Sequence, residues 1–111
     1  MPSRRLLVCC VFAVLASVQV LAQTFAPAVP YLSGGNGPNA VAMADVNGDG
    51  KPDLIVANWC TDSGCTASSV GVLLGNGDGT FQTAKTYGSG GLYADSVAVA
   101  DLGNGKLDIV V

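Results

Sequence analysis

The chain has 111 residues, a length that allows one domain at most, and half of its residues are apolar. Eight acidic side chains stand against five basic ones, so no basic surface for nucleic acid is expected. The sequence contains no histidine, which excludes a Ser-His-Asp catalytic arrangement, and we do not expect the chain itself to be an enzyme.

The N-terminal segment has the order of a secretory signal peptide. Arg4 and Arg5 precede an unbroken apolar run, Leu6–Ala16, and the small residue Ala22 ends the segment after Val20 and Leu21. A basic start, a short apolar middle and a small residue at the end are typical of a cleaved export signal. We therefore predict a signal-peptide helix over residues 1–22 and a mature region, 23–111, that is secreted or held at the cell surface or in the periplasm.

Two other uses of this segment are less consistent with its residues. A membrane anchor needs about 20 apolar residues, and Ser17 and Gln19 interrupt this run early, so stable membrane insertion is not expected. A lipid-bearing cysteine is not expected either, because Cys9 and Cys10 lie in the middle of the apolar run with no small residue before them.

The next distinctive stretch is an aspartate-rich loop between two apolar segments. Oxygen-bearing side chains recur at every second position, and the loop ends on a further carboxylate: Asp45, Asn47, Asp49, Asp53. Hard cations such as Ca²⁺ take six to eight oxygen ligands, including backbone carbonyls, and Lys51 would supply its carbonyl oxygen. Aspartates so close together repel each other, and a bound divalent cation reverses that penalty. The loop is therefore a candidate calcium site.

Two alternatives for this loop remain to be weighed. An EF-hand or dockerin loop needs a glutamate at its twelfth position and a helix after it, whereas this chain has Val56 there, no glutamate anywhere and a β-branched run. A simple hairpin turn would explain the Asn-Gly and Asp-Gly dipeptides, but not Asp53.

Two cysteines of the mature region lie in a polar segment after this loop. Cys60 and Cys65 are five positions apart, among turn-forming residues from Trp59 to Ser69. Export to an oxidising compartment favours a short disulfide loop over free thiols. Zinc is poorly supported, because two thiolates without histidine fill only half of a tetrahedral shell.

The mature region repeats itself at an offset of 56 positions. Thr24 aligns with Thr80, and with one deletion opposite Asn47 the match continues to Val111, half of the aligned pairs being identical. The first repeat covers residues 24–79 and the second, which is partial, covers residues 80–111. Shared turn, ligand and core positions indicate one structural unit used twice.

Each complete repeat is expected to hold four short strands. They are predicted at residues 41–44, 54–58, 70–74 and 80–87, with the aspartate loop joining the first two and a Gly-Asn-Gly-Asp-Gly turn joining the last two. Four strands per repeat suggest a β-propeller blade, so the predicted fold is all-β, with one four-stranded blade and part of a second. Alanines at alternate positions of the first strand fit strands that pack closely between neighbours.

These motifs together resemble the FG-GAP or VCBS repeat, the blade unit also found in the propellers of integrin α-subunits. The resemblance rests on the stretch from Val41 to Asn58 and on the later Gly-Val-Leu-Leu-Gly-Asn-Gly-Asp-Gly-Thr-Phe-Gln segment. It implies that calcium is held by the family's metal positions, Asp45, Asn47, Asp49, Lys51 and Asp53. It further implies an extracellular structural, adhesion or ligand-binding role.

The second copy of the loop departs from that pattern. Asp101 and Asp108 keep the two ends, Asn104 stands where Asp49 does, and Asn47 has no counterpart. With one carboxylate and one residue fewer, this loop is expected to bind calcium weakly or not at all.

A single blade leaves its faces open, and propellers commonly have four to eight blades. We therefore expect the sequence to be the start of a longer protein with further blades, and the isolated region to be weakly stable or to associate through unpaired strand edges. The full protein would bind an extracellular protein or carbohydrate, with Trp59 or Tyr93 stacking on a sugar in the latter case. The alternative is a larger secreted enzyme of which this region is the propeller part.

Overall fold

The computed structural model describes residues 24–111, so the predicted signal peptide at residues 1–22 lies outside the described part of the chain. All regular elements from residue 24 onward are strands, arranged in two antiparallel sheets. Within this part, no helix is long and apolar enough to cross a membrane. The all-β prediction is confirmed.

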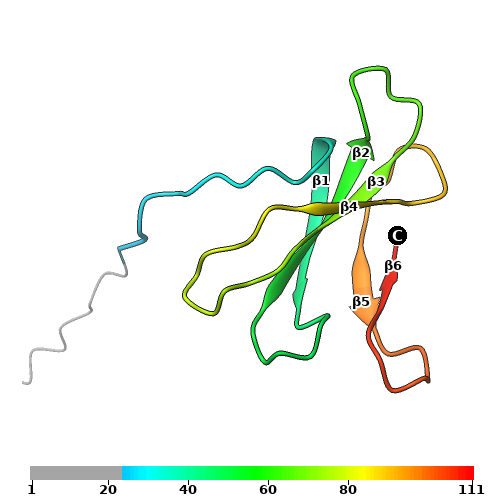
Figure 1. Cartoon of the computed structure of the whole chain (residues 1–111). Coiled ribbons are helices and arrows are strands. Elements are labelled where there is room, and N and C mark those ends of the chain that lie inside the picture. Colours follow the sequence, from blue (N-terminus) through cyan, green and yellow to red (C-terminus); the bar gives the residue numbers. More distant parts are fainter. Residues whose placement is uncertain (1–23) are drawn as a thin grey trace, which may run out of the picture.

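The first sheet is a four-stranded meander whose strands follow one another in chain order (Figure 1). Its strands are β1 (Asn36–Ala44), β2 (Asp53–Cys60), β3 (Ser69–Leu73) and β4 (Lys85–Gly88). Every neighbouring pair is antiparallel. This is the arrangement predicted for one propeller blade.

The strands β1 and β4 differ most from the prediction, while β2 and β3 lie within two residues of their predicted bounds. β1 begins at Asn36, five residues before the expected start, because its ladder with β2 continues past a bulge between Pro38 and Ala40. β4 begins only at Lys85, because the residues before it meet the end of β3 through an isolated Gly75–Phe81 bridge and not through a continuous ladder.

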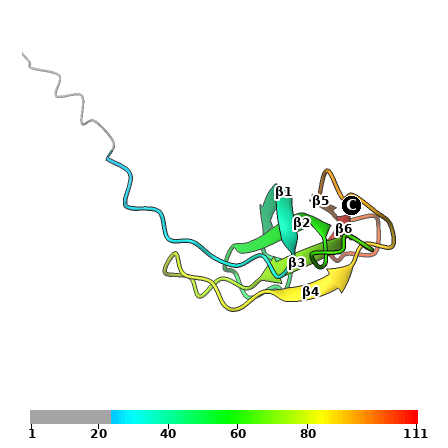
Figure 2. The ribbon, with the colours of Figure 1, turned by 90° about the horizontal axis from the view of Figure 1, so that it is seen from above.

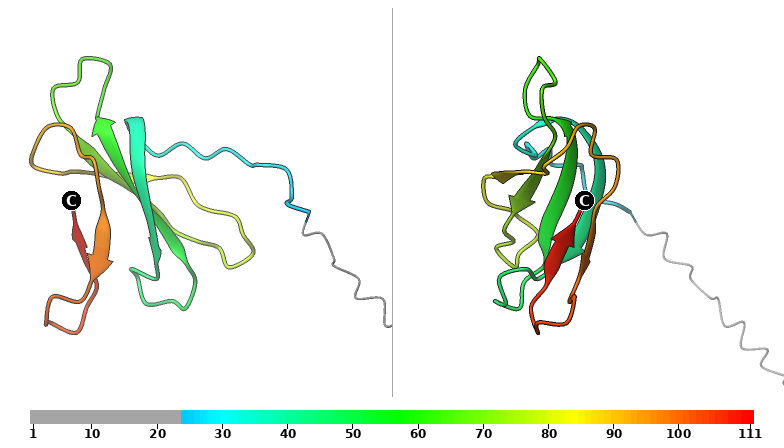
Figure 3. Two further views of the ribbon diagram at one scale, coloured as in Figure 1. Left: turned by 180° about the vertical axis from the view of Figure 1, so that it is seen from behind. Right: turned by 90° about the vertical axis from the view of Figure 1, so that its right-hand side faces the viewer.

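The second sheet consists of β5 (Ala98–Ala100) and β6 (Asp108–Val110), which are the first two strands of the second repeat. The sheet stands beside the first one with its β5 near β1 (Figure 3). The second copy of the aspartate loop joins its two strands, as the first copy joins β1 to β2.

The core lies between the two sheets. Ile55, Val70 and Val72 form its buried cluster on one face of the first sheet, and Val97 and Val99 pack against them from the second repeat. Ile55 is fully buried, and the whole of β3 is buried. Strand β3 is largely apolar because both of its faces are covered, whereas β2 alternates between buried and half-buried residues from Asp53 to Ala57.

The small side chains of β1 explain how the sheets come close. Ala42 pairs with Ile55 in the ladder and, with Ala44, lies against the core cluster. In a strand, alternate residues share a face, so both alanines point toward the second sheet. The expectation that these alanines serve close packing agrees with this arrangement.

The opposite face of the first sheet is crossed by the segment before β1. A Cβ added to Gly71 would lie 1.8 Å from the carbonyl oxygen of Ser33, so glycine is required where the backbone approaches. Earlier in the chain, residues 24–31 form no strand, although they align with the residues around β4. They lead away from the sheets (Figure 2), and Tyr31 contacts Phe81 edge to face with ring centroids 5.4 Å apart.

Candidate metal centre

The loop between β1 and β2 is organised around the carboxylate of Asp45. Its Oδ1 accepts hydrogen bonds from the backbone N–H groups of Gly48 (2.8 Å) and Asp49 (3.1 Å), and its Oδ2 accepts one from Gly50 (2.7 Å). Gly48 and Gly50 have φ angles of 76° and 80°, a region that favours glycine. The chain thus wraps around the first aspartate of the motif.

The next two oxygen-bearing residues are held by bonds to the backbone two positions later. Asn47 Oδ1 accepts from the N–H of Asp49 at 3.1 Å, and Asp49 Oδ1 accepts from the N–H of Lys51 at 2.9 Å. The Asn47 amide also donates to Asp49 Oδ2 at 3.3 Å. These bonds orient both side chains locally, while the loop remains exposed to solvent.

Asp53 differs from the other loop carboxylates because it is fully buried. Its Oδ2 accepts from the N–H of Val46 at 2.9 Å, and its Oδ1 accepts from the N–H of Gly75 at 2.8 Å. The second bond ties the β1–β2 loop to the turn that follows β3. Asp53 therefore has a structural function that its place in the motif did not predict, since Gly75 lies 22 residues further along the chain.

The side chain of Lys51 lies against the turn that follows β3. The aliphatic part of its side chain lies beside Gly77, where an added Cβ would be 3.3 Å from Lys51 Cγ and Cδ. The ammonium group is thus carried toward the Gly75–Gly79 turn. Any ligand from this residue is the backbone carbonyl oxygen, as the sequence predicts.

The donor set of this loop suits a hard cation. It contains only oxygen ligands, and a carboxylate oxygen that accepts one hydrogen bond retains a further lone pair. Asp49 and Asp53 each accept one bond at each oxygen. In residues 24–111, no three acidic, histidine or cysteine side chains are grouped closely enough to hold a metal by themselves, so the amide and carbonyl oxygens are needed to complete a site.

The loop between β5 and β6 repeats this frame with fewer oxygens. Asp101 Oδ1 accepts from the N–H groups of Gly103 (2.8 Å), Asn104 (3.0 Å) and Gly105 (3.0 Å), as Asp45 does in the first loop. Asp108 Oδ2 accepts from the N–H of Leu102 at 3.2 Å. The structure therefore supports the alignment with one residue deleted opposite Asn47.

Asn104 changes the chemistry at the centre of the second loop. Its Oδ1 accepts from the N–H of Lys106 at 2.8 Å, as Asp49 does from Lys51, but its amide donates to Asp108 Oδ2 at 3.4 Å. The Asn104 amide thus donates to Asp108, whose counterpart in the first loop, Asp53, is a proposed ligand. Hydrogen bonds, first from Gly103 and then from Gly105 and Asn104, hold the pKa of Asp101 below its ordinary value.

The comparisons with known proteins identify the first of these loops. Residues 37–58, which cover most of β1, the whole aspartate loop and most of β2, match the FG-GAP repeat family. This segment of the chain is similar to an FG-GAP repeat. The matched part is narrower than the predicted repeat at residues 24–79, and it includes every proposed metal ligand of the first loop. Neither a curated protein nor a solved structure is significantly similar to the chain.

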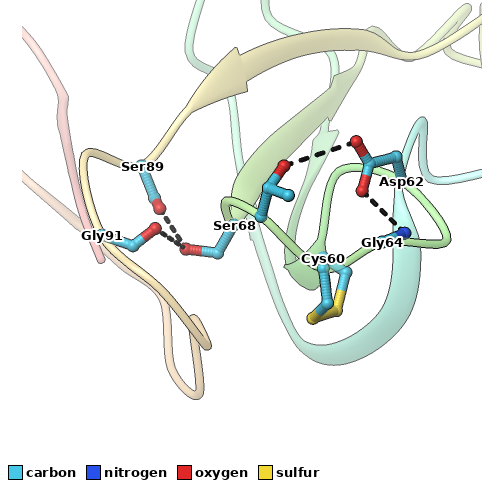
Figure 4. The surroundings of a disulfide bond; sticks show 8 residues. Cys60, Asp62, Gly64, Ser68, Ser89 and Gly91 are labelled. Atoms are coloured by element: carbon cyan, nitrogen blue, oxygen red, sulfur yellow. Dashed lines mark hydrogen bonds between the residues drawn. A yellow bond between two sulfur atoms is a disulfide. The ribbon is translucent and has the colours of Figure 1, made fainter.

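Just beyond the matched segment, Cys60 and Cys65 form a disulfide that closes the loop after β2 (Figure 4). Asp62 Oδ1 accepts from the N–H of Gly64 at 3.0 Å inside this loop. Ser68, just beyond it, donates its hydroxyl to the carbonyl of Gly91 at 2.9 Å, which links the loop to the chain that leads into the second sheet.

The fold also brings together two aromatic residues that the sequence left separate. Trp59 and Tyr93 contact each other with ring centroids 5.4 Å apart and ring planes at 69°. Both side chains are about half exposed. Tyr93 has a φ of 60°, which is uncommon for an aromatic residue. No sequence signal predicted this pair, because the two residues belong to different repeats.

Proposed function

We propose that this chain is a calcium-stabilised β-propeller module that is exported from the cell and has a structural, adhesion or ligand-binding role outside it. The observation that carries the proposal is the β1–β2 loop of the FG-GAP repeat. Its Asp45, Asn47 and Asp49 oxygens are oriented by backbone N–H groups of the same loop, and Asp53 anchors it to the sheet. The chain itself is assigned no catalytic role.

The proposed ligands are the side-chain oxygens of Asp45, Asn47, Asp49 and Asp53 and the carbonyl oxygen of Lys51. A bound cation would offset the repulsion among the carboxylates and hold β1 and β2 at a fixed separation. A ligand that binds only the folded state stabilises it by about 2.7 kcal/mol at a hundredfold excess over its Kd. Calcium would thus act on stability and not on chemistry.

The test is a calorimetric titration with Ca²⁺, accompanied by melting curves in calcium and in chelator. We expect the parent chain to release or absorb heat on binding and to melt at a higher temperature in calcium. Asp49→Ala should abolish both effects. Asp62→Ala is a matched control, because Asp62 is also an exposed aspartate that accepts a backbone hydrogen bond. Equal calcium responses in the parent and Asp49→Ala would refute the metal assignment.

A second candidate function is carbohydrate binding, and it is favoured by the contact between Trp59 and Tyr93. Half-exposed aromatic rings offer apolar faces on which sugar rings stack. Trp59 is the single tryptophan of the chain, so its fluorescence reports on this place alone. A saturable change in that fluorescence on adding oligosaccharides, lost in Tyr93→Ala, would support this function. A flat titration would contradict it. A propeller that is part of a larger secreted enzyme remains the other alternative.

A further inference from the structure

The chain contains four Asn-Gly dipeptides, and two of them are followed by the same residues. Asn-Gly-Asp-Gly occurs at residues 47–50 in the β1–β2 loop and again at residues 76–79 in the turn after β3. Asparagine before glycine is chemically labile, because glycine has no Cβ to hinder attack of its backbone nitrogen on the asparagine side chain. A large difference in reactivity between Asn47 and Asn76 would therefore come from the fold.

In the β1–β2 loop, the backbone nitrogen that would attack is engaged in a hydrogen bond. The Gly48 N–H donates to Asp45 Oδ1 at 2.8 Å. A bond from an N–H to a carboxylate is charge-assisted, and it must break before the nitrogen can lose its proton and approach Asn47. The wrapping of the loop around Asp45 thus protects Asn47.

The turn after β3 treats the corresponding nitrogen differently. Its hydrogen bonds use the N–H groups of Gly75, Asn76 and Thr80. Across residues 24–111, no oxygen accepts a hydrogen bond from the N–H of Gly77. Gly77 is also exposed, with a φ of 86°. Its nitrogen therefore gives up no hydrogen bond to the protein when it turns toward Asn76.

The two asparagine side chains are restrained to a similar degree. Asn47 Nδ2 donates to Asp49 Oδ2 at 3.3 Å, and Asn76 Nδ2 donates to Thr80 Oγ1 at 2.8 Å. Asn47 Oδ1 accepts from the N–H of Asp49 at 3.1 Å, and Asn76 Oδ1 accepts from Gln82 Nε2 at 3.5 Å. The state of the following glycine N–H is thus the main difference between the two sites.

The other two Asn-Gly dipeptides are held by the fold as well. After Asn104, the N–H of Gly105 donates to Asp101 Oδ1 at 3.0 Å, as in the first loop. The dipeptide at residues 36–37 lies in β1, where the ladder with β2 fixes the backbone. In the part of the chain that the structure describes, Asn76 alone combines an unbonded glycine N–H with a position outside a strand.

We propose that Asn76 is a site of spontaneous covalent modification, at which the side-chain amide is lost through a cyclic imide. The Gly77 nitrogen forms a bond to Asn76 Cγ, and water relays the Gly77 proton to the side-chain nitrogen, which leaves as ammonia. A second water molecule opens the imide. Cleavage between the nitrogen and Cγ gives aspartate, and cleavage between the nitrogen and the backbone carbonyl carbon gives isoaspartate. Water is the co-reactant, and nothing is oxidised or reduced.

Isoaspartate at position 76 would alter the turn, because the main chain then runs through Cβ and Cγ and is one atom longer. The turn is closed by the bond from the Asn76 N–H to the Thr80 carbonyl and by the bridge between Gly75 and Phe81. The Gly75 N–H also holds the buried Asp53 at 2.8 Å. Modification therefore weakens the contact between this turn and the start of β2.

The test compares deamidation rates in the full chain, expressed so that any processing of its N-terminus can occur. Folded and denatured samples are incubated in chelator at mildly alkaline pH, digested at acidic pH and analysed by mass spectrometry. In the folded chain, Asn76 should react about tenfold or more faster than Asn47, the effect on a rate of one hydrogen bond to a charged group. In denaturant the two rates should be nearly equal.

Asp101→Ala tests the physical reason. It removes the acceptor of the Gly105 N–H, so the rate at Asn104 should rise by a similar factor while the rate at Asn76 stays the same. Asp62→Ala is the matched control, because Asp62 is also an exposed aspartate that accepts from a glycine N–H but adjoins no Asn-Gly dipeptide. Circular dichroism confirms that each variant is folded before its rates are measured.

A second measurement tests the effect on the turn. The isoaspartate form, separated by chromatography, should melt at a lower temperature than Asn76→Asp. This variant carries the new carboxylate without the additional backbone atom. Equal melting temperatures would contradict the predicted weakening of the turn.

Three results would overturn the assignment of Asn76: equal rates at Asn47 and Asn76 in a folded chain, a difference between them that persists in denaturant, or a folded Asp101→Ala in which Asn104 stays slow. All rates are measured in chelator, so none of these results depends on calcium binding. Loss of the proposed calcium site would leave this proposal standing, and the reverse also holds.

Discussion

At the scale of single residues, the aspartates of the β1–β2 loop divide into two kinds. Asp49 is exposed and its bonds are local, whereas Asp53 is fully buried and accepts N–H groups from Val46 and Gly75. A buried carboxylate that is removed leaves its donors without partners. The two residues should therefore behave differently when they are replaced, even though the motif treats them alike.

Asp53→Ala is expected to lower the free energy of unfolding by about 2–4 kcal/mol in the presence of chelator, because two backbone N–H groups lose a charged acceptor. Asp49→Ala should cost less than about 1 kcal/mol under the same conditions, because its surroundings are solvated. Denaturant unfolding of both variants in chelator measures the difference. Equal losses would mean that the buried hydrogen bonds of Asp53 contribute no more to stability than the exposed ones of Asp49.

At the scale of elements, comparing the β1–β2 unit with the β5–β6 unit shows the effect of deleting the residue opposite Asn47. Both loops wrap backbone N–H groups around their first aspartate, so the frame does not need Asn47. The second loop has fewer oxygen-bearing side chains, because Asn47 has no counterpart. The position of Asp49 is taken by Asn104, whose amide donates to Asp108. The frame is therefore a property of the backbone turns, and the two loops differ in the oxygen-bearing side chains added to it.

Restoring the missing groups should restore a site. Inserting an asparagine between Leu102 and Gly103, together with Asn104→Asp, is expected to add a second calcium equivalent in the calorimetric titration. Asn104→Asp without the insertion is the control, and it should add little, because one ligand is still absent. If the parent binds calcium and the combined change adds no second equivalent, the spacing argument for the second loop is wrong.

At the scale of the whole molecule, stability depends on a small core between two sheets. Ile55, Val70 and Val72 are its buried cluster, and the second sheet reaches it mainly through Val97 and Val99. Large apolar side chains remain exposed on both outer sides. A core of this size leaves little stability in reserve, so a single cavity should have a large effect on the molecule as a whole.

Ile55→Ala is expected to reduce the free energy of unfolding by about 2–5 kcal/mol, since it removes a fully buried side chain and leaves a cavity. Val29→Ala should change it by less than about 0.5 kcal/mol, because Val29 is 69% exposed. Thermal or denaturant unfolding measures both. A similar small effect for the two variants would show that the contact between the sheets contributes little to stability.

The sequence alone determined the all-β class, the four-stranded meander and the aspartate loop between the first two strands. These features are local: turn dipeptides, alternating small and apolar residues, and oxygen-bearing side chains within nine positions need no distant contact to be recognised. The repeat then predicted the second loop and its missing oxygens by comparison of the chain with itself.

Only the tertiary structure decided what depends on distant pairs. It brought three pairs into contact whose members are more than 20 residues apart in the sequence. These are the hydrogen-bonded pairs Gly75–Asp53 and Asn39–Asp95 and the aromatic pair Trp59–Tyr93. It also decided which side of β1 and which side of β5 is covered. Strand alternation defines two faces but not which of them contacts a neighbouring sheet. The order in which the sheets stack determines that choice, and no single segment of the sequence contains it.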